Sequence, residues 1–224
     1  MILDESCSED LLLLAHPCRS RAERSLMTAE TAPLVVVVAG ANGAGKSTAA
    51  PSLLRDSFRV TEFINADTIA AGLSAFRPAS VAIAAGRIML ERMRHLAVSR
   101  KNFAFETTLA SRTLAPWPAA WKRDGYHVHL LFLWLKSAEL AVTRVAERVR
   151  LGGHDVPAEV VRRRYAAGSQ NLFQLYMPLI DSWQMFDNSE GPHPVPIAAG
   201  DRHSVRNIIT DVETWRRLEG SFGR

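Results

Sequence analysis

Cysteine is scarce in this sequence. The only two cysteines, Cys7 and Cys18, lie within the first twenty residues, so no disulfide framework can cross-link the rest of the chain. Neither belongs to a cluster with the spacing of a metal site. This pattern is typical of a protein kept under reducing conditions, and we expect a cytoplasmic location.

Long apolar runs are missing as well. The longest, 34–39 and 128–135, fall short of the roughly 20 residues that a membrane-spanning helix needs, so no membrane partner is expected. The net charge of +4 is mild, and it fits small anions as well as nucleic acid. The five tryptophans do not alternate with basic residues as in a single-strand binding platform, which makes a nucleic-acid partner a weaker prediction.

The first thirty residues differ from the remainder. Acidic residues come first, then the leucine run 11–14, then several arginines. A secretory signal has positive charge before a longer apolar segment. We therefore expect residues 1–30 to be a loosely held N-terminal extension, with Met27 as an alternative start, and residues 31–224 to form one domain.

From residue 34 onward, apolar strand patterns alternate with helical ones. This alternation predicts an α/β fold in which a parallel sheet is covered by helices on both faces. The expected strands are 34–39, 60–65, 102–107, 127–135 and 195–199. The expected helices are 79–98, 112–123, 137–151, 158–175, a short one from Pro178, and 204–218.

The segment Gly40-Ala-Asn-Gly-Ala-Gly-Lys-Ser47 has the pattern of a phosphate-binding loop. It follows an apolar strand and opens a helix, where backbone N–H groups can surround phosphate oxygens. The lysine can reach the β- and γ-phosphates, and the Ser47 hydroxyl can bind Mg²⁺. An ordinary glycine-rich turn is the alternative. The pattern predicts binding of ATP with Mg²⁺ by Gly40, Ala41, Asn42, Gly43, Ala44, Gly45, Lys46, Ser47 and Thr48.

Two acidic residues follow neighbouring strands. Asp67 lies in FINADTIA (63–70), and Glu106 lies in FAFETTL (103–109). Both should emerge at the carboxyl edge of a parallel sheet, beside the phosphate loop. A carboxylate there can accept the proton of an attacking hydroxyl. Alternatively, Asp67 or Asn65 only caps the following helix, and Glu106 is a partly buried acid bound to backbone N–H groups.

Arginines are concentrated on the two helices that flank Gly152-Gly-His-Asp-Val-Pro157. Such residues can steady a transferring phosphate from a mobile helical lid, here about 144–164. A solvated helix face is the alternative. His154, between the helices, is a candidate polar group of the lid, whereas His127 and His129 share a strand face without a third metal ligand of suitable spacing. The arginines are Arg144, Arg148, Arg150, Arg162, Arg163 and Arg164.

In their order and spacing, these segments resemble the zeta-toxin family of P-loop kinases, in its short branch that is often labelled predicted ABC-type ATPases. The resemblance covers about residues 34–200. Besides GANGAGKST, FINADTIA and FAFETTLASR, it includes RVAERVRLGGHDVPAEVVRRRY, NLFQLYMPLIDSW and the FDNS segment, 186–189.

The resemblance implies transfer of the ATP γ-phosphate to the 3′-hydroxyl of UDP-N-acetylglucosamine, and restraint by an antitoxin. It implies that Lys46 and Ser47 bind ATP and Mg²⁺ and that Asp67 is the base. Glu106 would position the acceptor, and Arg148 and Arg164 would steady the phosphate. Further candidates for the acceptor site are Asn65, Thr107, His154, Arg150 and Arg163.

Two other functions stay open. The GGHDVP lid is that of the short branch, whose acceptor need not be a nucleotide sugar, and a polynucleotide kinase is one alternative. A regulatory nucleotide-binding ATPase is the other. The strongest apolar strand ends in Lys136-Ser137 rather than in an acid, which argues against an efficient hydrolase.

Overall fold

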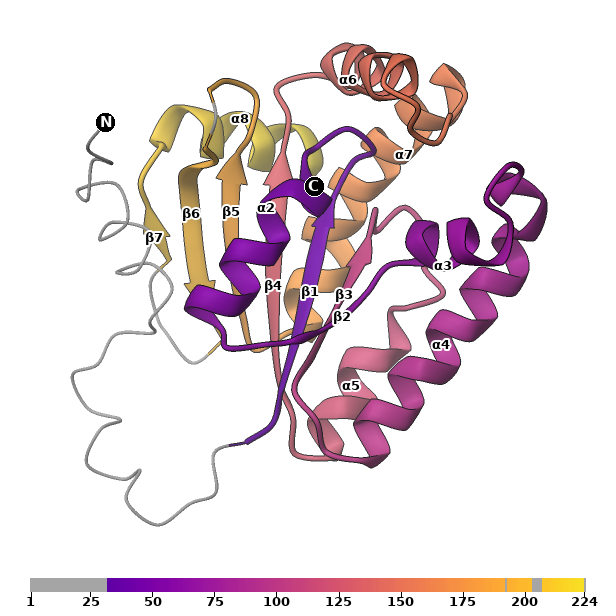
Figure 1. The fold of residues 1–224 in the computed structure, drawn as a ribbon. Coiled ribbons are helices and arrows are strands. Elements are labelled where there is room, and N and C mark those ends of the chain that lie inside the picture. Colours follow the sequence, from indigo (N-terminus) through magenta and orange to yellow (C-terminus); the bar gives the residue numbers. More distant parts are fainter. Residues whose placement is uncertain (1–31, 192, 203–206, 224) are drawn as a thin grey trace, which may run out of the picture.

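The computed structural model describes residues 32–191, 193–202 and 207–223, which Figure 1 shows arranged around one central sheet. The extension predicted for residues 1–30 lies outside these ranges. The strands are β1 (Leu34–Gly40), β2 (Glu62–Ile64), β3 (Phe103–Thr107), β4 (His127–Trp134), β5 (Ser182–Asp187), β6 (Val195–Asp201) and β7 (Ile208–Ile209).

The strand order is β2-β3-β1-β4-β5-β6-β7. The first five strands of this order are parallel, as expected, but β6 and β7 are antiparallel additions at one edge. A tight connection from β5 to β6 permits only antiparallel pairing, because parallel neighbours need a long crossover. The predicted parallel sheet is therefore confirmed for five strands, and the antiparallel pairing of this edge is an addition that the sequence did not indicate.

Helices connect the parallel strands, and one more follows β7 at the end of the described chain. They are α2 (Lys46–Ser52), α3 (Ala66–Leu73), α4 (Ala82–Val98), α5 (Pro116–Arg123), α6 (Ala138–Arg150), α7 (Ala158–Asn171) and α8 (Val212–Phe222). Shorter turns complete them: the π-helical η2 (Leu53–Ser57) and η4 (Leu172–Tyr176), and the 3₁₀ turns η3 (Pro78–Val81) and η5 (Met177–Leu179).

The sheet separates two apolar cores. Val35 and Val37 of β1 face a core that contains residues of α4, α5, η4 and α8. Val36 and Val38 face a second core built with α2, η2, α6 and α7. Burial on both faces explains the uninterrupted valine run, since a strand exposed on one face would alternate with polar residues.

Helix α7 passes from one face of the sheet to the other. Its Val161 belongs to the same core as α6, whereas Leu172, the first residue of η4, belongs to the opposite core. The α7–η4 segment therefore crosses the sheet near the carboxyl ends of its strands, where it contacts β1.

Two elements differ from the sequence prediction. No strand was expected between residues 135 and 195, but β5 is a full strand that pairs with β4. The last helix was expected from Ser204, but Ile208 and Ile209 form β7 and α8 begins at Val212. Asp211 fixes that start, because its carboxylate accepts a hydrogen bond from Thr214 N at 3.0 Å.

The two strand histidines bind the same hydroxyl group. His127 Nε2 lies 2.7 Å and His129 Nδ1 lies 2.8 Å from Ser182 Oγ on β5. His129 is buried, with Phe58 at 4.9 Å between ring centroids. Burial, with a smaller contribution from His127, lowers the pKa of His129 to about 3. These histidines therefore form a polar packing cluster between β4 and β5.

Among the described residues, no single helix is long and apolar enough to cross a membrane. Only α3 taken together with Pro78–Val98 reaches the required length and composition, and these two segments are bent by 107° relative to each other.

Candidate functional site

The phosphate loop joins β1 to α2 and is held in place by its neighbours. Gly43 and Gly45 have φ angles of 79° and 78°, which favour glycine. A Cβ atom on Gly43 would lie 2.7 Å from Ala141 O of α6, and one on Gly45 would collide with the Asn188 amide. The loop is therefore packed between α6 and the segment that follows β5.

The Lys46 side chain folds back over this loop. Its Nζ donates hydrogen bonds to Gly40 O at 2.9 Å and to Ala41 O at 2.8 Å. The side chain is buried, and burial lowers the pKa of Lys46 although the Glu106 and Asp67 carboxylates oppose the shift. The ammonium group thus lies beside the loop that would surround the phosphates.

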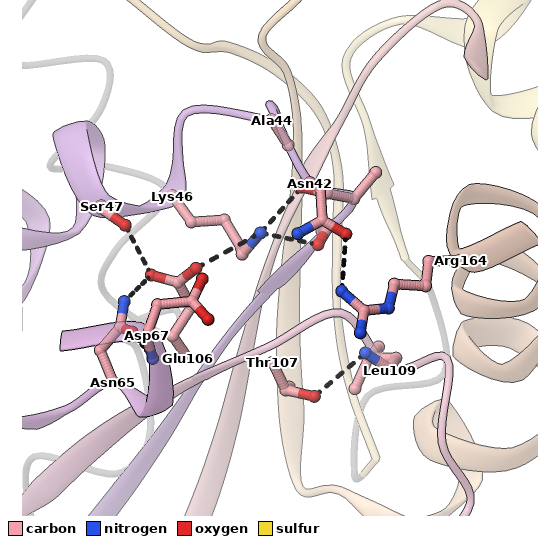
Figure 2. A network of polar contacts seen from close by, with 12 residues as sticks. Asn42, Ala44, Lys46, Ser47, Asn65, Asp67, Glu106, Thr107, Leu109 and Arg164 are labelled. Carbon is pink, nitrogen blue, oxygen red and sulfur yellow. Dashed lines mark hydrogen bonds and ion pairs between the residues drawn. The ribbon is translucent and has the colours of Figure 1, made fainter. Parts of the chain in front are cut away.

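Glu106 connects three residues of the site, as Figure 2 shows. Its Oε2 accepts hydrogen bonds from Ser47 Oγ at 2.8 Å and from Asn65 Nδ2 at 2.7 Å. Its Oε1 lies 3.5 Å from Lys46 Nζ. Because β3 pairs directly with β1, with Glu106 opposite Val38, the end of β3 supplies the acid that is missing from the end of β4.

Asn65, and not Asp67, caps helix α3. Its Oδ1 accepts hydrogen bonds from Asp67 N at 2.7 Å and Thr68 N at 3.2 Å. The exposed Asp67 carboxylate accepts no hydrogen bond from any described residue, and it lies beside Glu106 in Figure 2. The Asp67 carboxylate is therefore free to accept a proton, whereas both Glu106 oxygens already have partners within the site.

A cleft of about 420 Å³ opens in front of these groups. One wall carries the carboxylates, another carries the hydroxyls that follow β3, and a third comes from α7. Its lining consists of Asn42, Asn65, Ala66, Asp67, Met89, Glu106, Thr107, Thr108, Ala110, Ser111, Leu114, Arg163 and Arg164.

Two of the predicted arginines reach this cleft. Arg164 Nη1 donates a hydrogen bond to Asn42 Oδ1 of the phosphate loop at 3.3 Å. Arg163 is exposed and lines the cleft, and it forms no hydrogen bond or ion pair with another described side chain. Both lie on α7, so this helix borders the loop and the acceptor side together.

Arg148 lies on α6 beside the phosphate loop. It is close enough to Lys46 for its charge to lower the pKa of that lysine further. Its Nη2 donates a hydrogen bond to His154 O at 2.7 Å, whereas its buried Nε has no partner among the described residues. The His154 residue thus contributes a carbonyl group to the arginine, and its side chain does not line the cleft.

Arg162 and Arg150, two further arginines of the lid helices, do not reach the cleft. Arg162 makes two hydrogen bonds to Glu139, at 2.8 and 3.0 Å, and one to Glu159 at 2.7 Å. Arg150 is exposed at the end of α6 and does not line the cleft. The alternative of a solvated helix face therefore describes these two residues.

Sequence reasoning missed a support beneath the loop. Asn188 Nδ2 donates a hydrogen bond to Ala44 O at 2.8 Å. Arg144 in turn donates hydrogen bonds to Asn188 O at 2.7 Å and to Ser189 O at 3.0 Å. The FDNS segment was the available signal, but nothing in its composition indicates that it contacts the loop.

The donor atoms beside the loop suit Mg²⁺. Ser47 and Glu106 present hard oxygen atoms, and the described residues contain no group of three or more His, Cys, Asp or Glu side chains that could form a closed metal site. Mg²⁺ usually retains waters and binds through one or two protein oxygens together with substrate phosphates. The residues present therefore fit this ion.

A phosphate loop after β1, with β3 and β4 on either side of that strand, defines a P-loop kinase fold. Residues 19–189 match the family described as Zeta toxin. The chain belongs to the zeta toxin family. A Haemophilus influenzae protein described as uncharacterized is 31% identical over 127 residues, which is 56% of this chain and 88% of that protein.

Solved structures share this fold at low identity. A structure from the PezAT chromosomal toxin-antitoxin system of Streptococcus pneumoniae superposes with a TM-score of 0.61 at 17% identity, covering 99% of this chain and 90% of that one. The structure of AvrRxo1-ORF1:-ORF2 with ATP gives a TM-score of 0.66 at 18% identity, covering 94% and 70%. Family and fold together support an ATP-dependent kinase as the class of activity.

Proposed function

We propose that this protein transfers the γ-phosphate of ATP to a hydroxyl of a small metabolite, with a nucleotide sugar such as UDP-N-acetylglucosamine as the first candidate acceptor. One observation carries the proposal. The open carboxylate of Asp67 shares a cleft with the phosphate loop and with cleft-lining arginines. This is the arrangement that phosphoryl transfer to a hydroxyl requires.

Asp67 is the general base in this proposal. Asn65 already caps α3, so the Asp67 side chain is free to accept the proton of the acceptor hydroxyl. The acceptor oxygen then bonds to the γ-phosphorus while the bond to the ADP oxygen breaks. Glu106 serves a different purpose, because its oxygens already hold Ser47, Asn65 and Lys46.

The nucleotide would bind along the phosphate loop. Lys46 now donates to two loop carbonyls, and its ammonium group can instead contact the β- and γ-phosphates. Mg²⁺ held near Ser47 and Glu106 would neutralise charge on these phosphates. ATP is present in the related AvrRxo1 structure, which supports ATP as the phosphate donor here.

Arginines from the helical lid would stabilise the charge on the transferring group. Arg164 is already oriented toward Asn42, and Arg148 has a buried Nε without a described partner beside Lys46. Arg163 can contact the acceptor from the edge of the cleft. Several positive charges aimed at the equatorial oxygens give the preorganised stabilisation on which this reaction depends.

The shape of the cleft supports a small acceptor. A volume of about 420 Å³ lies in the range of about 300–1,000 Å³ found for small-molecule sites. Its hydroxyl, carboxylate and guanidinium groups fit a hydroxylated, anionic metabolite. Because a related structure comes from a toxin-antitoxin system, an antitoxin protein is the partner that we propose.

An acceptor assay tests this function. Wild type and Asp67→Asn are incubated with γ-labelled ATP and UDP-N-acetylglucosamine, and then with a metabolite extract. The expected result is label transfer by wild type and a loss of about 10²- to 10⁴-fold in the variant, with ATP affinity within twofold. Glu62→Gln, an exposed carboxylate on β2 paired with Arg92, is the matched control.

Other outcomes point to other functions. Equal transfer by wild type and Asp67→Asn contradicts the assignment of the base. ATP turnover at the same rate with and without every acceptor favours a regulatory ATPase. Transfer only to oligonucleotide ends, with steep salt dependence of binding, favours a polynucleotide kinase.

A further inference from the structure

The loop at residues 107–111 has a strained backbone although it lines the cleft. Leu109 has a φ of 55°, in the left-handed region that branched and bulky residues rarely occupy, and its side chain is buried in the core. Such strain persists only where the surroundings hold it, and it is frequent at functional sites. Thr107, Thr108 and Ser111 on this loop line the acceptor side of the cleft.

The groups that hold this loop come from one segment, α7–η4. Asn171 Nδ2 donates hydrogen bonds to Leu109 O at 2.8 Å and to Ala110 O at 3.4 Å. Tyr176 Oη donates a hydrogen bond to Ser111 O at 2.7 Å. Both side chains are buried, and together they bind the carbonyl groups of three consecutive loop residues.

The π-helical turn η4 makes this set of contacts possible. Asn171 and Tyr176 are five residues apart, and in a regular α-helix they would point about 140° away from each other. A π-helix closes its hydrogen bonds over five residues, so Leu172–Tyr176 brings the two side chains to the same loop. The π-helical turn thus lets Asn171 and Tyr176 bind the same loop of the cleft.

The same helix contacts the nucleotide side of the cleft. Arg164, in the middle of α7, donates to Asn42 of the phosphate loop. At Gly168, between these two regions, a Cβ atom would collide with Thr108 O. Helix α7 therefore contacts the 107–111 loop at Gly168 and the phosphate loop at Arg164, one turn earlier.

We propose that Asn171 and Tyr176 are positioning residues that hold the 107–111 loop in the conformation in which it receives the acceptor. This inference rests on the proposed kinase function. It assigns to the NLFQLY segment a role in acceptor affinity that is separate from ATP binding. Loss of either donor frees the loop to leave its strained conformation, so the acceptor wall changes while the phosphate loop keeps its own contacts.

The test compares two tyrosines in the α7–η4 segment. Tyr176→Phe removes only the hydroxyl that binds Ser111 O. Tyr165→Phe removes a hydroxyl that donates to Leu135 O at the same distance of 2.7 Å and not to the 107–111 loop. Asn171→Leu removes the second donor at similar volume, and Gln170→Ala is its exposed neighbour on the same helix.

Two readouts are measured. With UDP-N-acetylglucosamine and ATP, Tyr176→Phe and Asn171→Leu should raise the acceptor KM about three- to tenfold, with the ATP KM within twofold. Amide hydrogen exchange in residues 107–111 should rise by a similar factor in these variants. Tyr165→Phe and Gln170→Ala should leave both the acceptor KM and this exchange unchanged.

The outcomes separate this inference from the proposed function. If wild type transfers no phosphate to this acceptor, the nucleotide-sugar proposal fails, and exchange in the 107–111 loop still decides whether Asn171 and Tyr176 hold it. Unchanged exchange in Tyr176→Phe overturns the inference. So does an equal rise of acceptor KM and ATP KM, because that result indicates a general structural defect.

Discussion

Two regions of the cleft differ in how their charged side chains are bonded: the floor, formed by Lys46, Ser47, Asn65 and Glu106, and the lid, formed by α6 and α7. On the floor, Lys46 and Glu106 contact each other and their neighbours through a closed network of short hydrogen bonds. On the lid helices α6 and α7, Arg148 binds a backbone carbonyl and Arg163 has no described partner. The floor is thus organised before any ligand arrives, whereas the lid retains binding capacity for one.

This difference predicts how each region responds to mutation. Removing a residue from the floor should disturb several partners at once, because Glu106 alone connects Ser47, Asn65 and Lys46. Removing a lid residue should matter only where its side chain faces the cleft. Neighbouring arginines on the same helix should therefore differ widely in effect.

Among the variants that compare the floor with the lid, the largest effect is expected for Glu106→Gln. The substitution removes the charge opposite Lys46 and one acceptor from the network, so kcat/KM should fall by about 100-fold or more. Steady-state kinetics with γ-labelled ATP provide the measurement. A decrease of less than threefold would show that the floor network is not required for transfer.

Next in size is the contrast between Arg164→Ala and Arg162→Ala. Arg164 faces Asn42 and the cleft, and its loss should lower kcat/KM by about 10- to 100-fold. Arg162 is occupied by Glu139 and Glu159 at the surface, so its loss should change kcat/KM less than twofold. Similar losses in both variants would contradict the distinction between cleft-facing and surface arginines.

The histidine cluster on β4 lies outside both regions and should affect the pH dependence of the free energy of unfolding. The folded-state pKa of His129 is about 3, below its usual value of 6.5. Between these values the unfolded state binds more protons, so stability is lost as the pH falls through 6.5. His129 alone should lower the free energy of unfolding by about 1.5 kcal/mol between pH 6.5 and pH 5.

Denaturant unfolding at several pH values checks this expectation. In His129→Gln the free energy of unfolding should fall by about 1.5 kcal/mol less than in wild type between pH 6.5 and pH 5. If wild type and His129→Gln lose stability in parallel as the pH falls, the buried neutral histidine is not the cause.

The smallest effect is expected for the cap of α3. Asn65→Ala removes the acceptor of Asp67 N and Thr68 N, which should cost about 1 kcal/mol of stability. It also removes a donor to Glu106 and should lower activity. Asn65→Asp keeps an acceptor at the cap but not that donor. Unchanged activity in Asn65→Asp, with stability retained, would show that this donor is dispensable.

The floor of the site could be predicted from the sequence because its signals are local. A glycine-rich loop of this pattern between a strand and a helix is rarely anything other than a phosphate-binding loop. Acids that follow parallel strands meet at one edge of the sheet. The placement of Asp67 and Glu106 beside Lys46 followed from this rule. The sequence left open which residue caps α3, since Asn65 and Asp67 are both good capping residues.

The lid could not be predicted to the same extent. Arg162, Arg163 and Arg164 are consecutive, and each step along a helix turns the side chain by about 100°. Which arginine faces the cleft therefore depends on how α7 docks, and tertiary contacts decide that. Asn171 and Tyr176 were missed for the same reason, because no residue pattern indicates a π-helical turn.

Strand β5 was missed for a related cause. In β5, Ser182 and Gln184 are polar, so the segment lacks the apolar run of β1 or β4. Their partners are the two histidines of β4, and cross-strand pairs of this kind are known only once the register is known.

The close packing of the phosphate loop has an evolutionary consequence. Gly45 leaves no space for a side chain because the Asn188 amide, 143 positions later, occupies it. A lineage that replaces Asn188 with a smaller residue loses the hydrogen bond to Ala44 O and relaxes the steric demand at position 45. Since the φ of 78° favours glycine at this position in any case, part of the glycine pattern records a neighbour in the fold as well as a backbone conformation and a ligand.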